Sequence, residues 1–268
     1  MATITLRHVN ASGETLNESV SEGLCMLDKR YCAYQPGDRI ILECSQAPCE
    51  LEVSLDESLA PSIVYLPSGR MEFPIPQGAL CDGYPQQAFS GDCHFGWARE
   101  LTQRDRTNWR NLALNTHDLE DVDSVFPHAT TNSGAENPRF WARNAIDGTF
   151  QSCHHGRWPY ESWGINGRDD AWLQVDFGHT VHAEEAVLFL RADFPHDTWW
   201  EKVTLTCSDG FETTETMSKT GMPQRIDLGG RDIEWIRLSR LIRANEPSEW
   251  PALSQLMVMG TLESSTGK

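Results

Sequence analysis

The stretch from residue 153 to residue 164 holds the densest group of side chains that could do chemistry. It reads CHHGRWPYESWG, with two adjacent histidines and three aromatic rings between glycine, proline and serine. Such a stretch could bind a metal ion, form a catalytic pocket, stack on a sugar or plug the end of a core. A second group, LRADFPHDTWW (190–200), adds an arginine, two acids, a histidine and two tryptophans. The two groups can act together only if the fold brings them to one place.

Spacing argues against a metal ion at Cys153, His154 and His155. Adjacent side chains of an extended chain point to opposite sides, so three in a row cannot meet one ion without a sharp bend. No C-x-x-C or H-x-x-x-H partner stands nearby to complete a ligand set. A metal site is therefore not expected at these three residues.

Catalysis on a glycan needs two carboxylates that flank the scissile bond. Acids do lie near the aromatic residues: Glu161, Asp169, Asp170, Asp193 and Asp197. In a chain with 39 acidic residues such neighbours arise by chance, and no G-x-S-x-G, H-E-x-x-H or glycine-rich phosphate loop accompanies them. We expect a protein that is not an enzyme, with a hydrolase or lyase that uses Asp193 and Asp197 as the less favoured alternative.

Carbohydrate binding fits more of these side chains. Aromatic rings stack on the C–H faces of sugars, and planar polar groups pair with the hydroxyls. The candidate ligand-binding residues are His154, His155, Arg157, Trp158, Tyr160, Trp163, Arg191, Asp193, His196, Asp197 and Trp199. Because tryptophan is usually largely buried, a core plug remains open as an interpretation, and so does a protein–protein or homodimer surface.

The composition indicates a globular chain that does not bind nucleic acid. The 268 residues carry 39 acidic and 22 basic side chains, and the net charge of -17 would repel phosphate backbones and anionic lipid surfaces. No apolar run of twenty residues is present, so we expect no membrane span. The first residues show no secretion signal, which predicts a cytoplasmic protein whose eight cysteines stay reduced, mostly as small core residues.

Short alternating segments closed by turn residues predict an all-β fold in two sets. The first set is 39–44, 50–55, 62–66 and 71–75, and the second is 172–178, 185–192, 202–207, 211–217, 234–241 and 255–260. A short helical turn is expected around 94–104, and the polar segment 110–125 is typical of a connector. We therefore expect one β-sandwich domain in residues 1–115 and a second in residues 116–268.

Several motifs of the second half occur in a recognisable order. They are ARNAIDG (142–148), DDAWLQVDFG (169–178), TLTCSDG (204–210), IRLSRL (236–241) and ALSQLMVMG (252–260). Together they resemble the discoidin, or coagulation-factor C-type, superfamily of galactose-binding-like β-sandwiches. The stretches 155–164 and 190–200 resemble those of a bacterial subgroup in which an extra β-rich domain comes first. The resemblance implies a jelly roll that binds a glycan or oligosaccharide, in a lectin-like manner, through loops at one end.

The same resemblance implies a structural Ca²⁺ ion, but the sequence departs from the family pattern. The family often has A-x-S-E in its last strand, and here the acidic position is Gln255. Asp147 remains as a hard oxygen ligand, and carbonyl groups near Asn144 and Thr149 could add to it. The alternative is that Asp147 and Gly148 only form a turn.

Overall fold

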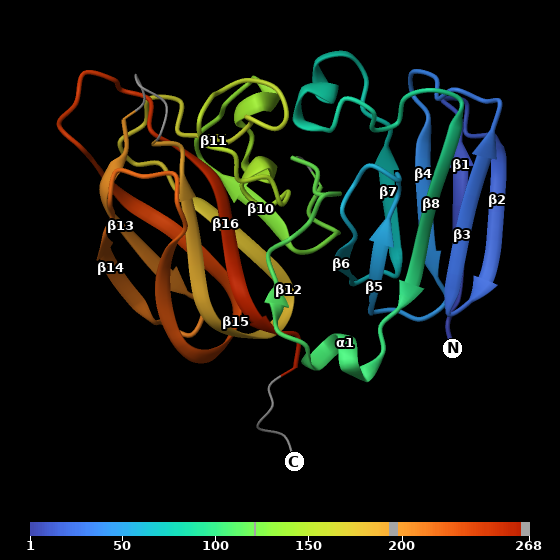
Figure 1. Cartoon of the computed structure of the whole chain (residues 1–268). Coiled ribbons are helices and arrows are strands. Elements are labelled where there is room, and N and C mark those ends of the chain that lie inside the picture. The colour runs from blue at the N-terminus through green and yellow to red at the C-terminus, as the bar shows by residue number, and fades with distance from the viewer. Residues whose placement is uncertain (121, 193–197, 264–268) are drawn as a thin grey trace.

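The chain folds into two β-sandwiches that lie side by side (Figure 1). The structure is a computed structural model that describes residues 1–120, 122–192 and 198–263. Its sheets are antiparallel throughout, so the all-β prediction is confirmed. Within the described residues, no helix is both long enough and apolar enough to cross a membrane.

The N-terminal sandwich consists of two four-stranded sheets. One sheet has the order β2-β1-β4-β7 and the other the order β3-β8-β5-β6. Its strands are β1 (Thr3–Val9), β2 (Thr15–Glu22), β3 (Leu24–Arg30), β4 (Arg39–Cys44), β5 (Cys49–Ser54), β6 (Ser62–Leu66), β7 (Arg70–Pro74) and β8 (Cys93–Glu100). Between β7 and β8 lies the 3₁₀ helix η1 (Gly78–Gly83). Alternate side chains, such as Met71 and Phe73 of β7, fill the space between the sheets.

The expected helical turn at 94–104 is wrong, because most of that segment is strand β8. Its residues alternate between buried positions (His94, Gly96, Ala98) and more exposed ones, which is the period of a strand. The helix α1 (Gln103–Thr107) begins only after this strand, and a capping box formed by Thr102 and Asp105 fixes its first turn.

The C-terminal sandwich is one eight-stranded assembly with the order β11-β16-β12-β15-β13-β14; β9 pairs with β16 and β10 with β12. Its strands are β9 (Arg110–Asn111), β10 (His128–Thr131), β11 (Trp163–Gly164), β12 (Leu173–Leu190), β13 (Trp200–Cys207), β14 (Glu212–Thr216), β15 (Gln224–Arg243) and β16 (Ala252–Thr261). Two 3₁₀ helices, η2 (Pro138–Phe140) and η3 (Ala142–Ala145), precede β11. The segments expected at 172–178 and 185–192 belong to one long strand, β12, whose pairing shifts at two irregularities.

The segment around residue 115, where the sequence predicts the domain boundary, contacts both sandwiches. β9 already pairs with β16 of the second sandwich, through Met259↔Asn111 and Gly260↔Arg110. Further along, Val125 packs into the N-terminal core again. The connector 110–125 is therefore shared by both cores.

Hydrogen bonds and close packing hold the two sandwiches together. The backbone N–H of Leu55 donates to Nε2 of the buried His117 at 3.0 Å. Gly178, at a φ of 72°, lies so close to Phe126 that a Cβ atom there would be 2.5 Å from its Cδ2. A glycine is needed here both for the backbone angle and for the contact.

The cysteines are less buried than predicted. All eight are free thiols, and only Cys25 and Cys207 are buried. Cys81, Cys93 and Cys153 are exposed, whereas Cys44 and Cys49 are partly buried and pack against the N-terminal core, so the interpretation as core residues holds fully for two positions and in part for two more.

Candidate functional site

A cleft of about 380 Å³ opens at the end of the C-terminal sandwich where β11, β12 and β16 meet. The pairing of Gly164 with Ala252 and the hydrogen bond from Arg191 N to Ala252 O (3.0 Å) join the segments that surround it. Its lining is Ala135, Phe140, His155, Gly164, Ile165, Asn166, Arg191, Ser248, Trp250, Pro251 and Ala252.

Two aromatic rings, Phe140 and Trp250, belong to this lining. A Cβ atom on Gly164 would be 3.1 Å from Cβ of Phe140, so the glycine allows the phenylalanine to pack against the strand. Trp250 is 57% exposed. Phe140 thus comes from η2, and Trp250 comes from the loop before β16 and is more than half exposed.

The polar side chains of the cleft are Arg191, Asn166 and His155, with Ser248 at the same surface. Arg191 is 5% exposed, and its Nη1 donates to Oγ of Ser162 at 3.0 Å. Its guanidinium carbon lies 5.9 Å from the centre of the Phe140 ring. A buried arginine beside a ring is a rigid, planar hydrogen-bond donor, which suits recognition of hydroxyl or carboxylate oxygens.

The sequence predictions for this site have different outcomes. Arg191 and the exposed His155 lie in the cleft. His154 is exposed, with its ring 5.4 Å from that of the half-buried Tyr160. Trp199 is half-buried and packs against the C-terminal core. Asp193, His196 and Asp197 lie outside the described residues.

The prediction that Trp163 binds a ligand is wrong, because this residue lies in the core. Its side chain has no exposed surface, and its Nε1 donates to Oγ1 of Thr131 at 3.0 Å. Its ring centre lies 6.0 Å from that of the buried Trp200. No face of this indole is left for a sugar.

Arg157 and Trp158 point to the N-terminal sandwich rather than into the cleft. Arg157 pairs with Asp82 of η1 at 2.9 Å, and the backbone N–H of Trp158 donates to the Asp82 carbonyl at 2.8 Å. Arg139 binds the same carboxylate at 2.6 Å. The Trp158 ring, 38% exposed, lines a separate groove of about 170 Å³ together with Tyr84.

Sequence reasoning missed four side chains of the cleft: Phe140, Asn166, Ser248 and Trp250. Trp250 stands in a polar, proline-rich loop, NEPSEWP (245–251), just before the last strand. An aromatic residue in such a loop is a usable signal, because a loop at the surface has few ways to bury a large ring.

Among the predicted calcium residues, Asp147 has a buried side-chain oxygen that makes no hydrogen bond of good geometry. Gly148 N donates to Gln255 Oε1 at 3.2 Å, Asn144 Nδ2 donates to Pro138 O at 2.9 Å, and Thr149 N donates to Asp147 Oδ1 at 2.9 Å. The oxygen without such a bond is Oδ2 of Asp147. The hydrogen bond from Gly148 N to the side chain of Gln255 thus holds the 147–149 turn.

Glu161, which sequence reasoning counted only among the nearby acids, faces Asp147. Glu161 is 1% exposed, and its buried carboxyl oxygens make no hydrogen bond of good geometry, although the side chains of Asp147 and Thr149 lie near them. Burial, and for Asp147 also the neighbouring Glu161, raises the pKa of both carboxyl groups. Unpaired buried carboxyl oxygens are the donor type that Ca²⁺ prefers. Among the described residues, however, no group of three or more His, Cys, Asp or Glu is placed to hold a metal ion.

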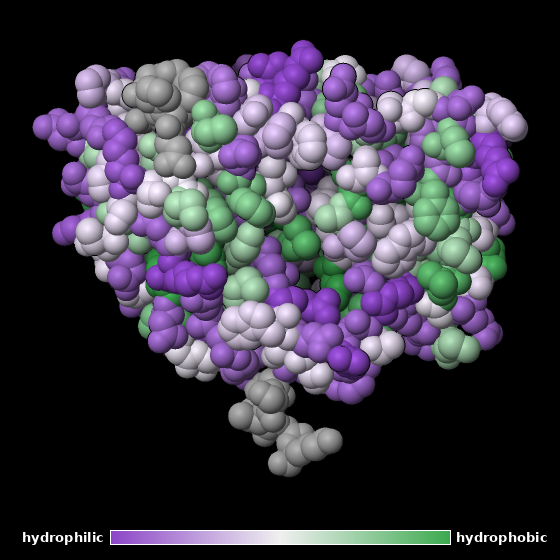
Figure 2. All heavy atoms as spheres, viewed as in Figure 1, coloured by the Kyte–Doolittle hydropathy of each residue, from purple (hydrophilic) through white to green (hydrophobic). Residues whose placement is uncertain are grey.

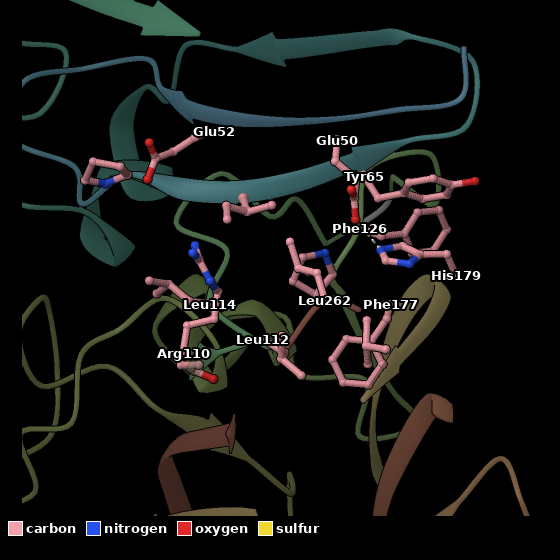
Figure 3. A pocket seen from close by; sticks show the side chains of 15 residues that line it. Glu50, Glu52, Tyr65, Arg110, Leu112, Leu114, Phe126, Phe177, His179 and Leu262 are labelled. Carbon is pink, nitrogen blue, oxygen red and sulfur yellow. Dashed lines mark ion pairs between the residues drawn. The ribbon is translucent and has the colours of Figure 1, made fainter. Parts of the chain in front are cut away.

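A second cavity, of about 120 Å³, lies between the sandwiches (Figure 3). Glu50 and Glu52 of β5 face Arg110 and His179 across it. Glu50 pairs with His179 at 3.2 Å and also with Arg106, while Glu52 pairs with Arg99. Since its carboxylates already have partners, we interpret this cavity as part of the domain contact.

Comparisons with known proteins found no matching family model and no matching curated protein. Among solved structures, the chain is similar to chitosan-binding module 1 from a chitosanase/glucanase of Paenibacillus sp. IK-5, with 22% identity over 56% of this chain and 99% of the module (TM-score 0.40). It is also similar to the lectin domain of lectinolysin complexed with Lewis B antigen, with 18% identity over 57% and 97% of the two chains (TM-score 0.40). A family 32 carbohydrate-binding module of C. perfringens NanJ, in complex with galactose, matches with 18% identity over 49% and 91% (TM-score 0.38). These structures are carbohydrate-binding modules and a lectin domain.

Proposed function

We propose that this protein is a non-catalytic carbohydrate-binding protein whose glycan lies in the cleft between Phe140 and Trp250. The observation that carries the proposal is the combination, in one cleft, of two aromatic rings with the buried guanidinium of Arg191. Rings bind the C–H faces of a sugar, and fixed donors bind its hydroxyl oxygens. The volume lies near the lower end of the usual range for small-molecule pockets, about 300–1,000 Å³, so a short glycan or a chain end fits better than a long polymer.

Binding is favoured over hydrolysis by the chemistry of the lining. A glycosidase needs two carboxyl groups that face each other across the bond. Among the described residues that line the cleft there is no aspartate or glutamate. A hydrolase or lyase would have to use Asp193 and Asp197. Turnover of an oligosaccharide that is lost in Asp193→Asn would identify such an enzyme.

The test is a glycan array followed by calorimetric titration of the best ligand. Removing one stacking ring with Trp250→Ala should weaken binding by roughly 5- to 30-fold, about 1–2 kcal/mol. Trp109→Ala is a matched control, because this tryptophan is 51% exposed and does not line the cleft. Absence of binding to any sugar, or equal affinities for the parent and Trp250→Ala, would rule out this site.

We also propose that a structural Ca²⁺ ion is held by the carboxyl oxygens of Asp147 and Glu161. The support is the pair of buried carboxyl groups described above, Asp147 and Glu161, which lie close together and whose oxygens make no hydrogen bond of good geometry. A bound ion would neutralise the pair and tie the 147–149 turn to the loop that carries His155. At calcium concentrations about 100 times the Kd, the melting temperature should rise by about 5–10 °C over that in chelator. Glu161→Gln should lose this increase, and a parent protein that does not respond to Ca²⁺ would contradict the proposal.

A surface for another protein is a second candidate function, favoured by an apolar area on the N-terminal sandwich. Leu24 and Met26 of β3 and Phe95 of β8 are 43%, 52% and 42% exposed on the outer face of one sheet. Figure 2 shows hydrophobic side chains gathered over this end of the molecule. If two copies meet there, the mass in solution should rise with concentration, and Met26→Asp should keep the chain monomeric.

A further inference from the structure

Three nitrogen-bearing side chains gather inside the N-terminal sandwich, far from the cleft. Lys29 of β3 stands directly opposite His94 of β8, and His8 comes from β1 in the facing sheet. Their exposed fractions are 7%, 4% and 0%. Buried lysines are rare in proteins unless they are paired, so this group requires an explanation.

Most of the nitrogen atoms in this group have no hydrogen-bond partner. Nζ of Lys29 and Nδ1 of His8 are buried and unbonded among the described residues, and neither ring nitrogen of His94 makes a hydrogen bond of good geometry, although the Gly91 carbonyl lies near this ring. Nε2 of His8 has a partner, Oδ2 of Asp38 at 2.8 Å. A native interior rarely leaves so many polar atoms unsatisfied, which points to an occupant that the protein atoms do not supply.

Tyr34 covers the group from the segment between β3 and β4. The ring centre of Tyr34 lies 4.2 Å from that of His94 and 5.1 Å from that of His8, and Nζ of Lys29 is 4.3 Å from it. Below this ring is a cavity of about 10 Å³, lined by Lys29, Tyr34, His94 and aliphatic side chains of the core such as Leu55. This volume is at the lower limit for one water molecule, so a halide ion, which is larger, would enter only with small outward shifts of the lining side chains.

The nearby carboxylates are already engaged by other donors. Oδ2 of Asp38 accepts from Gln35 N at 2.9 Å as well as from His8. Asp56 accepts from Phe89 N at 2.7 Å and from Ser58 N at 2.9 Å. The ammonium of Lys29 therefore lacks a contacting carboxylate among the described residues, and a buried charge without one is strongly unfavourable.

We propose that this cavity binds a single monatomic anion, such as chloride, through Nζ of Lys29 and a ring N–H of His94. The ammonium supplies the charge and the imidazole a second donor, while the small volume excludes polyatomic anions such as sulfate or phosphate. Burial lowers the pKa of His94, and Lys29 lowers it further, so the ring is neutral and keeps one N–H to donate.

The test compares melting temperatures of the full chain in sodium chloride, sodium bromide and sodium gluconate at equal ionic strength. A halide at about ten times its Kd should raise the melting temperature by about 3–6 °C, with saturation as its concentration grows. Lys29→Met should lose the halide dependence. The matched control Lys202→Met, on an exposed position of β13, should keep it.

Crystals of the unmodified protein grown in bromide provide a second measurement that does not depend on a variant. An anomalous peak between Lys29 and His94 would support the site even if Lys29→Met does not fold. Density for an ordinary water molecule there, or the same melting temperature in halide and gluconate, would overturn the proposal.

Discussion

Protonation of His117 should unfold the protein in acid, because this ring joins the two sandwiches in its neutral form. It is 1% exposed, and its Nε2 accepts the N–H of Leu55, so Nδ1 carries the proton and donates to Oγ1 of Thr116 at 3.1 Å. Burial, with the nearby Arg143, lowers the pKa of His117 to about 3 from the ordinary 6.5. A protonated ring could not accept from Leu55.

The direction and size of the effect follow from this pKa. Between about pH 6.5 and pH 3 the unfolded chain binds a proton at His117 that the folded chain does not, so stability falls as the pH falls. The difference of about 3.5 pKa units corresponds to a loss of about 5 kcal/mol by pH 3, or at most about 1.4 kcal/mol for each pH unit. Above about pH 6.5 the full stability is present.

The substitution that tests this is His117→Gln, which offers an amide oxygen to Leu55 but does not titrate. Urea unfolding at several pH values from 4 to 7 should give a free energy whose pH slope is smaller in the variant, by up to about 1.4 kcal/mol per unit. Carboxyl groups with altered pKa values contribute to both proteins and cancel in the difference. Equal slopes for the parent and His117→Gln would refute the reasoning.

Three further substitutions test the fold. Trp163→Ala should cost about 3–5 kcal/mol in urea unfolding, since it empties a fully buried site, and a cost below about 1 kcal/mol would contradict that burial. Gly178→Ala should lower stability by about 2 kcal/mol or more, because a Cβ atom meets Phe126 at a positive φ; unchanged unfolding would show that the sandwiches do not touch there. Burial raises the pKa of Glu120 to about 7. The folded chain therefore takes up a proton at Glu120 before the unfolded chain does, and the free energy of unfolding rises as the pH falls from 7 to about 4.5. Glu120→Gln should therefore be more stable than the parent at pH 8 by up to about 3 kcal/mol and equal to it near pH 4, and the reverse order in denaturant titrations would contradict this.

Alternation of side chains was sufficient to predict most strands and the all-β class. β6, which buries one face, appears in the structure at the expected residues, and so does β4, in which Ile40, Ile41 and Leu42 are all buried. The helical turn expected at 94–104 failed because alanine, leucine and charged residues suit a helix, whereas pairing of β8 with β3 and β5 decides in favour of a strand. Tertiary pairing of this kind overrides local propensity.

The cleft could be predicted only in part, because its residues are distant in sequence. Trp250 and His155 are brought together by the pairing of Gly164 with Ala252, a register that one sequence does not reveal. The same pairing places Trp163 in the core, although its neighbours in sequence are polar and resemble a surface loop.

Under the proposed function, the ion pairs of Arg139 and Arg157 with Asp82 would give the N-terminal sandwich an indirect part in glycan binding, although none of the described residues that line the cleft comes from it. Arg139 and Arg157 belong to the loops that also carry Phe140 and His155, and both grip one carboxylate of the other domain. A loop that is already immobilised loses less conformational entropy when a ligand arrives. Separation of the two sandwiches should therefore weaken glycan affinity through added disorder in these loops, with every contacting side chain still present.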